Sequence, residues 1–216
     1  MKKVIVVLLM ISFAITNFAQ QNDQKAIEIL DKLSLKIDKY KSLNIEFKFY
    51  VENLKDASRN LYPGKVLYRG DRYKLELMGQ IVFSDGKTNW TYLDDAEEVN
   101  IADANESDAT IFNPQTLLKN YTKEYKCRWI SDKFEQNRAL VEIDLYPIKI
   151  NDKKYSKITL RIDKTKMQLF SVRYVGKDGV SYFVEINKFI ENPTIPDKDI
   201  VFSKNLFPDA EIIDMR

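Results

Sequence analysis

The residue types that most often carry enzyme chemistry are scarce in this chain of 216 residues. It contains no histidine, which excludes a Ser-His-Asp or Cys-His catalytic pair, an imidazole metal site and a histidine pH switch. Cys127 is the only cysteine, so neither an internal disulfide nor a cysteine zinc cluster can form. It lies in an apolar segment with nothing nearby in sequence to activate the thiol, and we expect a core residue.

One group of carboxylates is spaced closely enough to suggest chemistry. Such groups serve in paired-carboxylate hydrolysis or calcium binding, and this one comprises Asp94, Asp95, Glu97 and Glu98. The segment lacks EF-hand spacing and falls at a predicted hairpin tip, so we expect a solvated turn. With no histidine to complete a catalytic site, the sequence predicts a protein that is not an enzyme and uses no metal or cofactor.

The charges give no sign of a nucleic-acid partner. The 34 Lys and Arg residues and 32 Asp and Glu residues are spread along the chain. A nucleic-acid binder normally shows a concentrated basic face, so we expect no such partner here.

The first residues have the pattern of a secretory signal. A positive start precedes the largely apolar residues 4–15, which are shorter than the roughly 20 residues of a membrane span. We predict a signal peptide over residues 1–19 with cleavage after Ala19. Cleavage after Ala14 and an uncleaved membrane anchor are the alternatives. The remaining residues 20–216 fit one domain without a linker or internal repeat.

The elements that must position any site begin with an amphipathic helix over residues 23–41. Asp23 is its predicted N-cap, and apolar side chains recur every three or four positions along one face, at Ile27, Leu30, Leu33, Ile37 and Tyr40. From residue 43 onward the period changes to two, and residues 43–51 alternate apolar with polar side chains, as a half-buried strand does.

Short strands and tight turns then continue to the C-terminus. Asp-Gly between apolar runs, at residues 84–87, is a strong hairpin signal. The pattern predicts one meandering antiparallel sheet of ten or so strands, at residues 43–51, 61–68, 73–78, 81–83, 89–93, 125–130, 140–146, 157–163, 169–175 and 180–189.

Residues 107–121 interrupt this rhythm. Asn113 can cap a helix and a proline follows it at the first helical position. Leu117, Leu118 and Tyr121 share one face of that helix. Together with the first helix it could cover a sheet that curls without closing. Such a sheet encloses either a filled core or a cavity for an apolar ligand, and periodicity leaves both open.

Several segments resemble those of a known family. Residues 81–92 read Ile-Val-Phe-Ser-Asp-Gly-Lys-Thr-Asn-Trp-Thr-Tyr, which resembles the Ser-Asp-Gly stretch of periplasmic outer-membrane lipoprotein carrier proteins, the LolA family. The helix end at residues 40–43, the strands at 45–47 and 64–68, and the Phe-Pro-Asp-Ala-Glu-Ile-Ile-Asp segment at 207–214 follow in family order. The resemblance covers nearly the whole mature chain.

The resemblance implies an unclosed antiparallel β-barrel of about 11 strands, covered by short helices, around an apolar cavity. In the family that cavity takes the acyl chains of lipoproteins released by an inner-membrane ABC transporter and carries them across the periplasm to the outer membrane. The implied protein is a monomeric periplasmic carrier whose partners are acylated lipoproteins and the ABC-type release complex. The C-terminal addition is shorter than in the better-known branch, so the outer-membrane acceptor is left unspecified.

The resemblance also implies a set of site residues. In the better-known branch an arginine at the end of the second long strand hydrogen-bonds the lid, and Arg69 matches this latch best, with Arg72 as the alternative. The Lys-Arg-Pro tripeptide of that branch is absent here. We expect the lining of the acyl cavity to comprise Phe47, Phe49, Leu67, Leu75, Leu77, Trp90, Tyr92, Leu117 and Leu118.

Two other functions on the same fold stay open. The chain could carry a different apolar molecule, such as a glycolipid or an aryl-polyene lipid. It could also be a ligand-sensing module like the periplasmic anti-sigma co-regulators, although a sensor of that kind normally brings a second domain.

Overall fold

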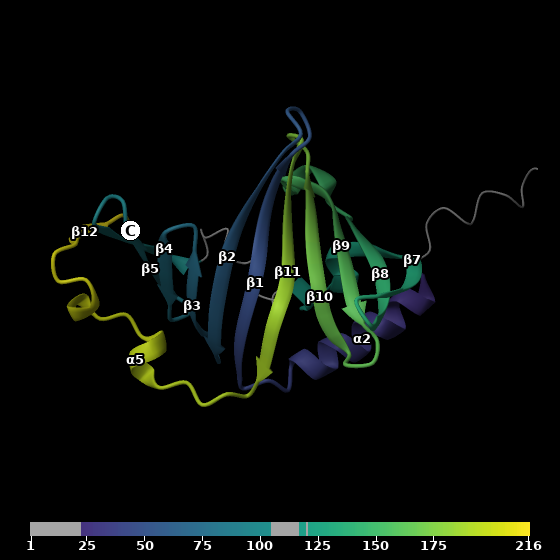
Figure 1. The fold of residues 1–216 in the computed structure, drawn as a ribbon, viewed down its shortest axis with the longest axis horizontal. Coiled ribbons are helices and arrows are strands. Elements are labelled where there is room, and N and C mark those ends of the chain that lie inside the picture. The colour runs from purple at the N-terminus through teal and green to yellow at the C-terminus, as the bar shows by residue number, and fades with distance from the viewer. Residues whose placement is uncertain (1–22, 105–116, 120) are drawn as a thin grey trace, which may run out of the picture.

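Twelve strands form one curved sheet in the computed structural model, which describes residues 23–104, 117–119 and 121–216 (Figure 1). The order across the sheet is β12-β6-β5-β4-β3-β2-β1-β11-β10-β9-β8-β7. The end strands β12 and β7 do not pair with each other, so the sheet does not close into a barrel. The predicted unclosed sheet with short helices is confirmed, with 12 strands where about 11 were expected.

Most neighbouring strands are joined by short turns and run antiparallel. Their bounds are β1 (Ser42–Asn53), β2 (Ser58–Arg69), β3 (Arg72–Leu77), β4 (Gln80–Ser84), β5 (Thr88–Leu93), β6 (Glu98–Asp103), β7 (Tyr125–Glu135), β8 (Arg138–Pro147), β9 (Tyr155–Asp163), β10 (Gln168–Gly176), β11 (Val180–Glu191) and β12 (Glu211–Asp214). The sequence prediction missed β6 and β12, which are both short.

The Ser-Asp-Gly motif forms the turn between β4 and β5. The Asp85 carboxylate accepts hydrogen bonds from the backbone N–H groups of Lys87 and Thr88, at 2.9 and 2.8 Å. Gly86 has a φ of +87°, which L side chains rarely adopt, and a Cβ there would lie 3.0 Å from the Cβ of Asp71. The Ser-Asp-Gly motif therefore forms a tight hairpin turn, as the sequence predicted.

Helix α2 (Gln24–Ile37) starts at its predicted cap. The Asp23 carboxylate accepts a hydrogen bond from the backbone N–H of Lys25 at 3.0 Å, and the backbone N–H of Asp23 donates to the Cys127 carbonyl at 3.1 Å. The first contact satisfies one of the N–H groups left free at the start of the helix, and the second attaches the helix to β7. The helix ends four residues before the predicted residue 41. Its buried face comprises Ala26, Leu30, Leu33 and Ile37.

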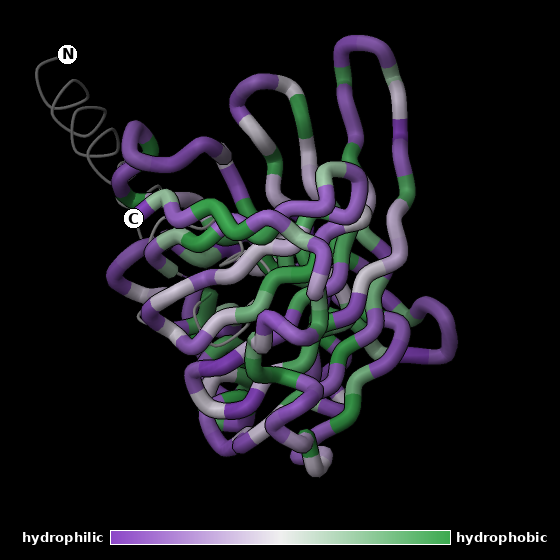
Figure 2. Tube along the Cα trace, turned by 90° about the vertical axis from the view of Figure 1, so that its left-hand side faces the viewer, coloured by the Kyte–Doolittle hydropathy of each residue, from purple (hydrophilic) through white to green (hydrophobic). Residues whose placement is uncertain are grey.

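The remaining helices are single turns: α4 (Tyr121–Glu124), η3 (Ile150–Asp152), α5 (Asp197–Ile200) and η4 (Lys204–Leu206). Most of the helix predicted over residues 107–121, and the predicted signal peptide, lie outside the described residues, although residues 117 and 118 are helical. Within the described part of the chain, no helix is long and apolar enough to cross a membrane. Hydrophobic segments gather toward the middle of the strands and hydrophilic ones at the turns (Figure 2).

The chain after β11 crosses the sheet and ends at its edge. We call residues 192–214 the C-terminal strap. It includes α5 and η4 and finishes in β12, which pairs parallel to β6, with Glu211 opposite Glu98. This pairing departs from the all-antiparallel prediction. It arises because the strap runs past the lower ends of β1 to β3 and reaches β6 from the side (Figure 1).

Candidate functional site

One face of the sheet, the inner face, carries an apolar cluster on strands β1 to β4 and β11. Phe47 and Phe49 alternate with polar residues along β1, and Leu75 lies between Val66 and Val82 on the neighbouring strands. Side chains two residues apart point to the same face, so the register carries this surface from strand to strand. We call it the first cluster: Leu43, Ile45, Phe47, Phe49, Val66, Tyr68, Leu75, Val82 and Val184.

A second cluster continues the inner face under α2. It combines the buried side of α2 with residues of β7 to β10, for example Val172, which is paired with Val184 of the first cluster. Tyr40 and Ile186 are partly buried and pack against both clusters. In the order of the sheet, the inner face is therefore apolar from β4 across β1 and β11 to β7, with a border between its two clusters at Tyr40 and Ile186.

The predicted lining residues fall into three groups. Phe47, Phe49 and Leu75 belong to the first cluster, and Leu77 packs against it. Leu117 and Leu118 are buried in the second cluster, on the same face of the sheet as the first group. The sequence prediction brought these residues to one side of the sheet, and the structure agrees for this part of the set.

Leu67, Trp90 and Tyr92 do not share that face. Leu67 lies between Val66 and Tyr68, which both belong to the first cluster, so its side chain points to the opposite face. Strand pairing likewise aligns Trp90 with Phe83, away from the inner face. This corrects the prediction that all nine lining residues share one face of the sheet. Neighbouring residues of a strand point to opposite faces, and the aromatic content of a strand does not show which face each ring occupies. The role of the three residues in ligand binding stays a prediction.

Trp90 and Tyr92 instead contact the C-terminal strap. The rings of Trp90 and Phe202 are stacked with centroids 5.5 Å apart, and those of Tyr92 and Phe207 are stacked at 4.0 Å. Phe83, which is buried, meets both strap rings edge-on. Aromatic pairs of this geometry stabilise beyond their buried area. The strap thus covers an aromatic surface on the outer face of β4 and β5.

Arg69, the predicted latch, also holds the strap. Its guanidinium donates to the Ile195 carbonyl at 2.6 Å and forms an ion pair with Asp197 at the start of α5. Hydrogen bonding to Arg69 lowers the pKa of the Asp197 carboxyl, and the charge of Arg72 adds a smaller effect in the same direction. The partners that the structure gives Arg69 therefore lie in the strap, whereas the prediction placed them in the lid helix. The latch role itself stays a prediction.

Polar contacts also hold α2 and residue 121 against the sheet. The Tyr40 hydroxyl donates to Glu191 at 2.9 Å, and the Lys36 ammonium pairs with the same carboxylate at 2.9 Å. The Tyr121 hydroxyl donates to Asp31 of α2 at 2.7 Å. Burial and these carboxylates raise the pKa of both tyrosines, so each remains a neutral donor.

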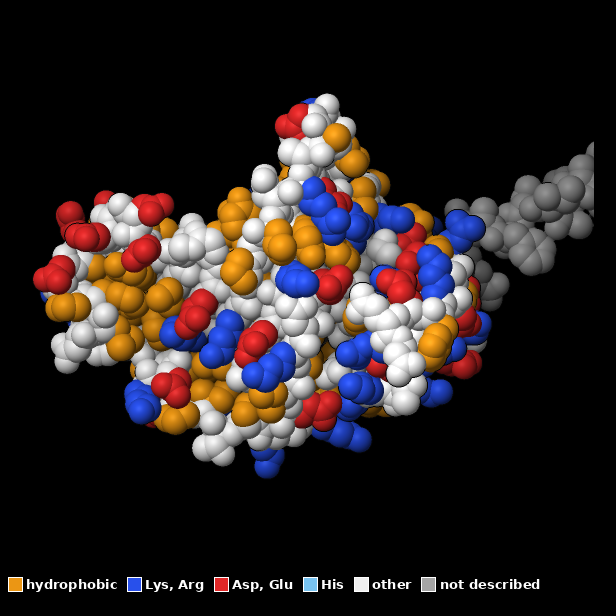
Figure 3. All heavy atoms as spheres, viewed as in Figure 1, with side chains coloured by type: hydrophobic (Ala, Val, Ile, Leu, Met, Phe, Trp, Pro, Cys, Tyr) orange, Lys and Arg blue, Asp and Glu red, His pale blue; other side chains and the backbone are white. Residues whose placement is uncertain are grey.

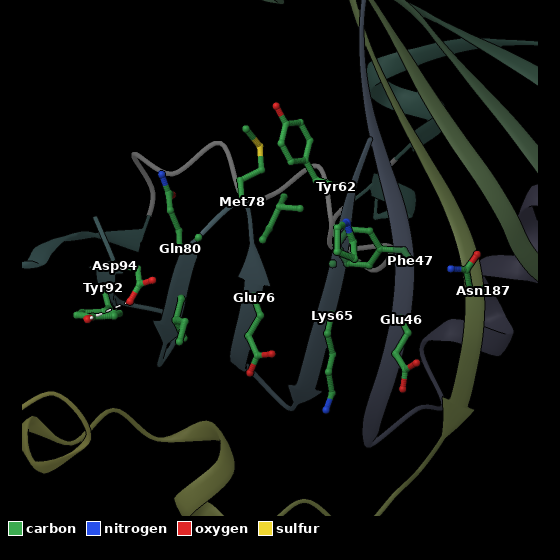
Figure 4. Close-up of a pocket in the computed structure, with 15 residues that line it drawn as sticks. Glu46, Phe47, Tyr62, Lys65, Glu76, Met78, Gln80, Tyr92, Asp94 and Asn187 are labelled. Atoms are coloured by element: carbon green, nitrogen blue, oxygen red, sulfur yellow. Dashed lines mark hydrogen bonds between the residues drawn. The ribbon is translucent and has the colours of Figure 1, made fainter. Parts of the chain in front are cut away.

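A pocket of about 860 Å³ opens along strands β1 to β5 (Figure 4). Its lining mixes apolar side chains such as Phe47 and Met78 with charged ones, because residues of both parities along the strands contribute. Figure 4 shows Glu46, Lys65 and Glu76 side by side on β1, β2 and β3. The volume lies in the range of small-molecule sites, and the mixed lining suits an amphiphile.

Cys127 and the acidic turn at residues 94–98 are the other groups that the sequence analysis considered. Burial raises the pKa of the Cys127 thiol to about 12, which keeps it protonated and unreactive. The turn between Asp94 and Glu97 is exposed, and within the described residues no group of three acidic or cysteine side chains is placed to hold a metal ion.

Comparison with known proteins gives one family. The family model described as outer membrane lipoprotein carrier protein LolA matches residues 15–142, more than half of the chain. No curated protein sequence matches the chain.

Solved structures share the architecture at low sequence identity. An uncharacterized conserved protein from Thermus thermophilus is 12% identical with a TM-score of 0.59, and the match covers 88% of this chain and 99% of that one. LprF from Mycobacterium bovis is 13% identical with a TM-score of 0.51, covering 82% of this chain and 98% of that one. At these identities the two structures establish the fold alone.

Proposed function

The chain belongs to the outer membrane lipoprotein carrier protein family, LolA, and from this premise we propose that it carries the acyl chains of lipoproteins from the inner to the outer membrane. The observation that supports the proposal most is the apolar inner face of an unclosed sheet, formed by two adjoining clusters. A single acyl chain of about 14 carbons left in water costs on the order of 10 kcal/mol, at roughly 0.8 kcal/mol per methylene. Diffusion between two membranes therefore requires such a shield.

The acyl chains would enter between the two clusters. Tyr40 and Ile186 pack against both of them, so a chain inserted there would pass between the two clusters and contact Phe47 and Phe49 of the first. Partly exposed polar contacts, such as the pair between Lys36 and Glu191, hold α2 at this border. Partly exposed ion pairs contribute little, so the main cost of opening is the exposure of apolar surface, which bound acyl chains would cover.

The finer features of the proposal follow the family. The carrier is not an enzyme, acts in the periplasm after removal of residues 1–19, and works as a monomer. It receives acylated lipoproteins from an inner-membrane ABC-type release complex. The outer-membrane acceptor is left open.

Native mass spectrometry with lipid extraction, on protein purified from its own periplasm, tests the proposal directly. A co-purifying triacylated lipoprotein is the expected result. A free glycolipid or pigment lipid would instead indicate a carrier of another lipid on the same fold. An empty protein that captures the periplasmic domain of a membrane protein would indicate a sensor, and both results would refute lipoprotein transport.

A further inference from the structure

Three loops gather at one end of the molecule, at the top of Figure 1. They are the tip between β1 and β2 (residues 54–57), the loop between β8 and β9 (residues 148–154), and the turn between β10 and β11 (residues 176–179). We call this surface the three-loop end. It lies outside both inner-face clusters and the strap, so neither the fold nor the proposed cavity accounts for its composition.

Hydrogen bonds connect the three loops to one another. The backbone N–H of Leu54 donates to the Gly179 carbonyl at 3.0 Å, and that of Lys177 donates to the Lys154 carbonyl at 3.1 Å. The Lys177 ammonium also donates to the Ile150 carbonyl. The loops therefore present one connected surface, and their side chains keep fixed places relative to one another.

This surface exposes three large aliphatic side chains. Leu54 is 71% exposed, Ile148 49% and Ile150 48%. A single exposed aliphatic residue is ordinary, but several on adjoining loops indicate a surface that is covered in use. Phe134, at the far end of the β7–β8 hairpin, is 75% exposed and has no such neighbours among these loops.

The charges around these side chains are predominantly basic. The three loops carry five lysines and three aspartates. Asp56 and Asp178 turn back on their own loops, where their carboxylates accept hydrogen bonds from the backbone N–H groups of Ser58 and Val180. The Lys153 ammonium pairs with Glu124 at 3.1 Å and the Lys177 ammonium donates to the Ile150 carbonyl, so the basic character of the surface comes from the excess of lysines over aspartates in the loops.

The opposite sign dominates another part of the molecule. Acidic side chains surround the edge formed by β5, β6 and β12, which appears at the left of Figure 3. Glu98 and Glu211 are direct neighbours across β6 and β12, and Asp94, Asp95 and Glu97 lie in the adjoining turn. An anionic surface would repel this edge and attract the three-loop end, which fixes an orientation.

We propose that the three-loop end docks on the surface of an anionic phospholipid bilayer, with Leu54, Ile148 and Ile150 inserted at the headgroup boundary and the surrounding lysines on the lipid phosphates. Aliphatic anchors flanked by basic side chains are the composition that binds such an interface. Strand β1 leads from Leu54 to Phe47, a span of seven residues or about 23 Å. Docking would therefore point this end of strand β1, and the first cluster behind it, toward the bilayer.

Sedimentation with protein-free vesicles tests this inference. Wild-type protein is expected to sediment with vesicles of phosphatidylcholine and phosphatidylglycerol, to bind vesicles of phosphatidylcholine alone less, and to dissociate as salt rises. The double variant Leu54→Glu with Ile150→Glu should bind the anionic vesicles at least tenfold more weakly, equivalent to about 1.4 kcal/mol. The matched pair is the single variant Leu54→Glu and the control Phe134→Glu, which each introduce one carboxylate at similarly exposed positions, 71% and 75%. Leu54→Glu should weaken binding, and Phe134→Glu should bind as wild type does.

Two results would overturn the proposal. The first is wild-type protein that does not sediment with either kind of vesicle. If the double variant nevertheless lost cargo transfer in the presence of membrane proteins, the three-loop end would contact a protein and not the lipid. The second is equal binding by wild type and the double variant. Circular dichroism and thermal unfolding confirm that the variants fold. Acyl binding, measured separately, should be the same in the double variant as in wild type. Wild-type protein that binds no acyl chains would refute lipoprotein transport but not membrane docking.

Discussion

Replacing Gly64 with alanine would make the new methyl group clash with the ring of Phe47. The two residues are direct partners across β1 and β2, and the Phe47 ring lies flat over the glycine. A Cβ at Gly64 would overlap the Cε2 and Cζ atoms of that ring and lie 3.1 Å from Cδ2. The ring must therefore move, although Phe47 is only 2% exposed and packed within the first cluster.

The magnitude follows from this clash. Overpacking of a filled core typically costs about 1–3 kcal/mol, and we expect Gly64→Ala to lose that much free energy of unfolding. Phe47→Ala alone should cost about 3–5 kcal/mol, because it leaves a cavity. In the double variant the new methyl group meets no ring, so the cost of Gly64→Ala should largely vanish. The two changes should therefore be non-additive by at least about 1 kcal/mol.

Urea unfolding of the four proteins, followed by circular dichroism, measures this cycle. Gly64→Ala should also lower Tm by about 2–4 °C per kcal/mol in a domain of this size. Asn60→Ala, at an exposed position further along the same strand, is the control and should unfold as wild type does. Additive costs for Gly64→Ala and Phe47→Ala would refute the contact and the inner-face geometry built on it.

Four further predictions concern other contacts. Leu118→Ala should cost about 2–5 kcal/mol in urea unfolding, because Leu118 is buried against α2, and an unchanged midpoint would contradict its place in the second cluster. Arg69→Leu should speed hydrogen exchange in the strap more than Arg72→Leu does, and equal rates would show that the contact with Asp197 is not limiting. Because Arg69 lowers the pKa of Asp197, the ion pair between them should stabilise the strap above the pKa of an unfolded aspartate and lose this effect as pH falls below that value. Exchange protection of the strap that is independent of pH in that acidic range would contradict this. Cys127, whose pKa is about 12, should react with a disulfide reagent at pH 8 only after unfolding, and rapid labelling of the native protein would contradict its burial.

Local patterns were sufficient for most elements of the fold. The period of three to four residues in α2, its cap at Asp23, and the turn at Asp85 and Gly86 all rest on contacts between residues close in sequence. The short strands β6 and β12 were missed because neither has a distinct pattern of its own. β12 forms because the strap delivers it to the free edge of β6.

The candidate site was predicted less completely. Phe47, Phe49 and Leu75 were identified because alternation in β1 and β3 marks one face clearly. Leu67 was assigned to the same lining although its neighbour Val66 occupies the inner face. Nothing in the sequence near Trp90 showed that Phe202 would cover it, since the two residues lie more than a hundred positions apart.

The sequence by itself determined the family, the run of strands and turns, the first helix and the absence of histidine chemistry, because these depend on composition and on spacing along the chain. The tertiary structure alone decided which face each aromatic side chain occupies, that Arg69 holds the strap through Ile195 and Asp197, and that three distant loops form one exposed surface. The reason is physical. Strand parity and register are fixed by pairing with a partner strand, and packing brings together residues whose separation in sequence carries no signal of their contact.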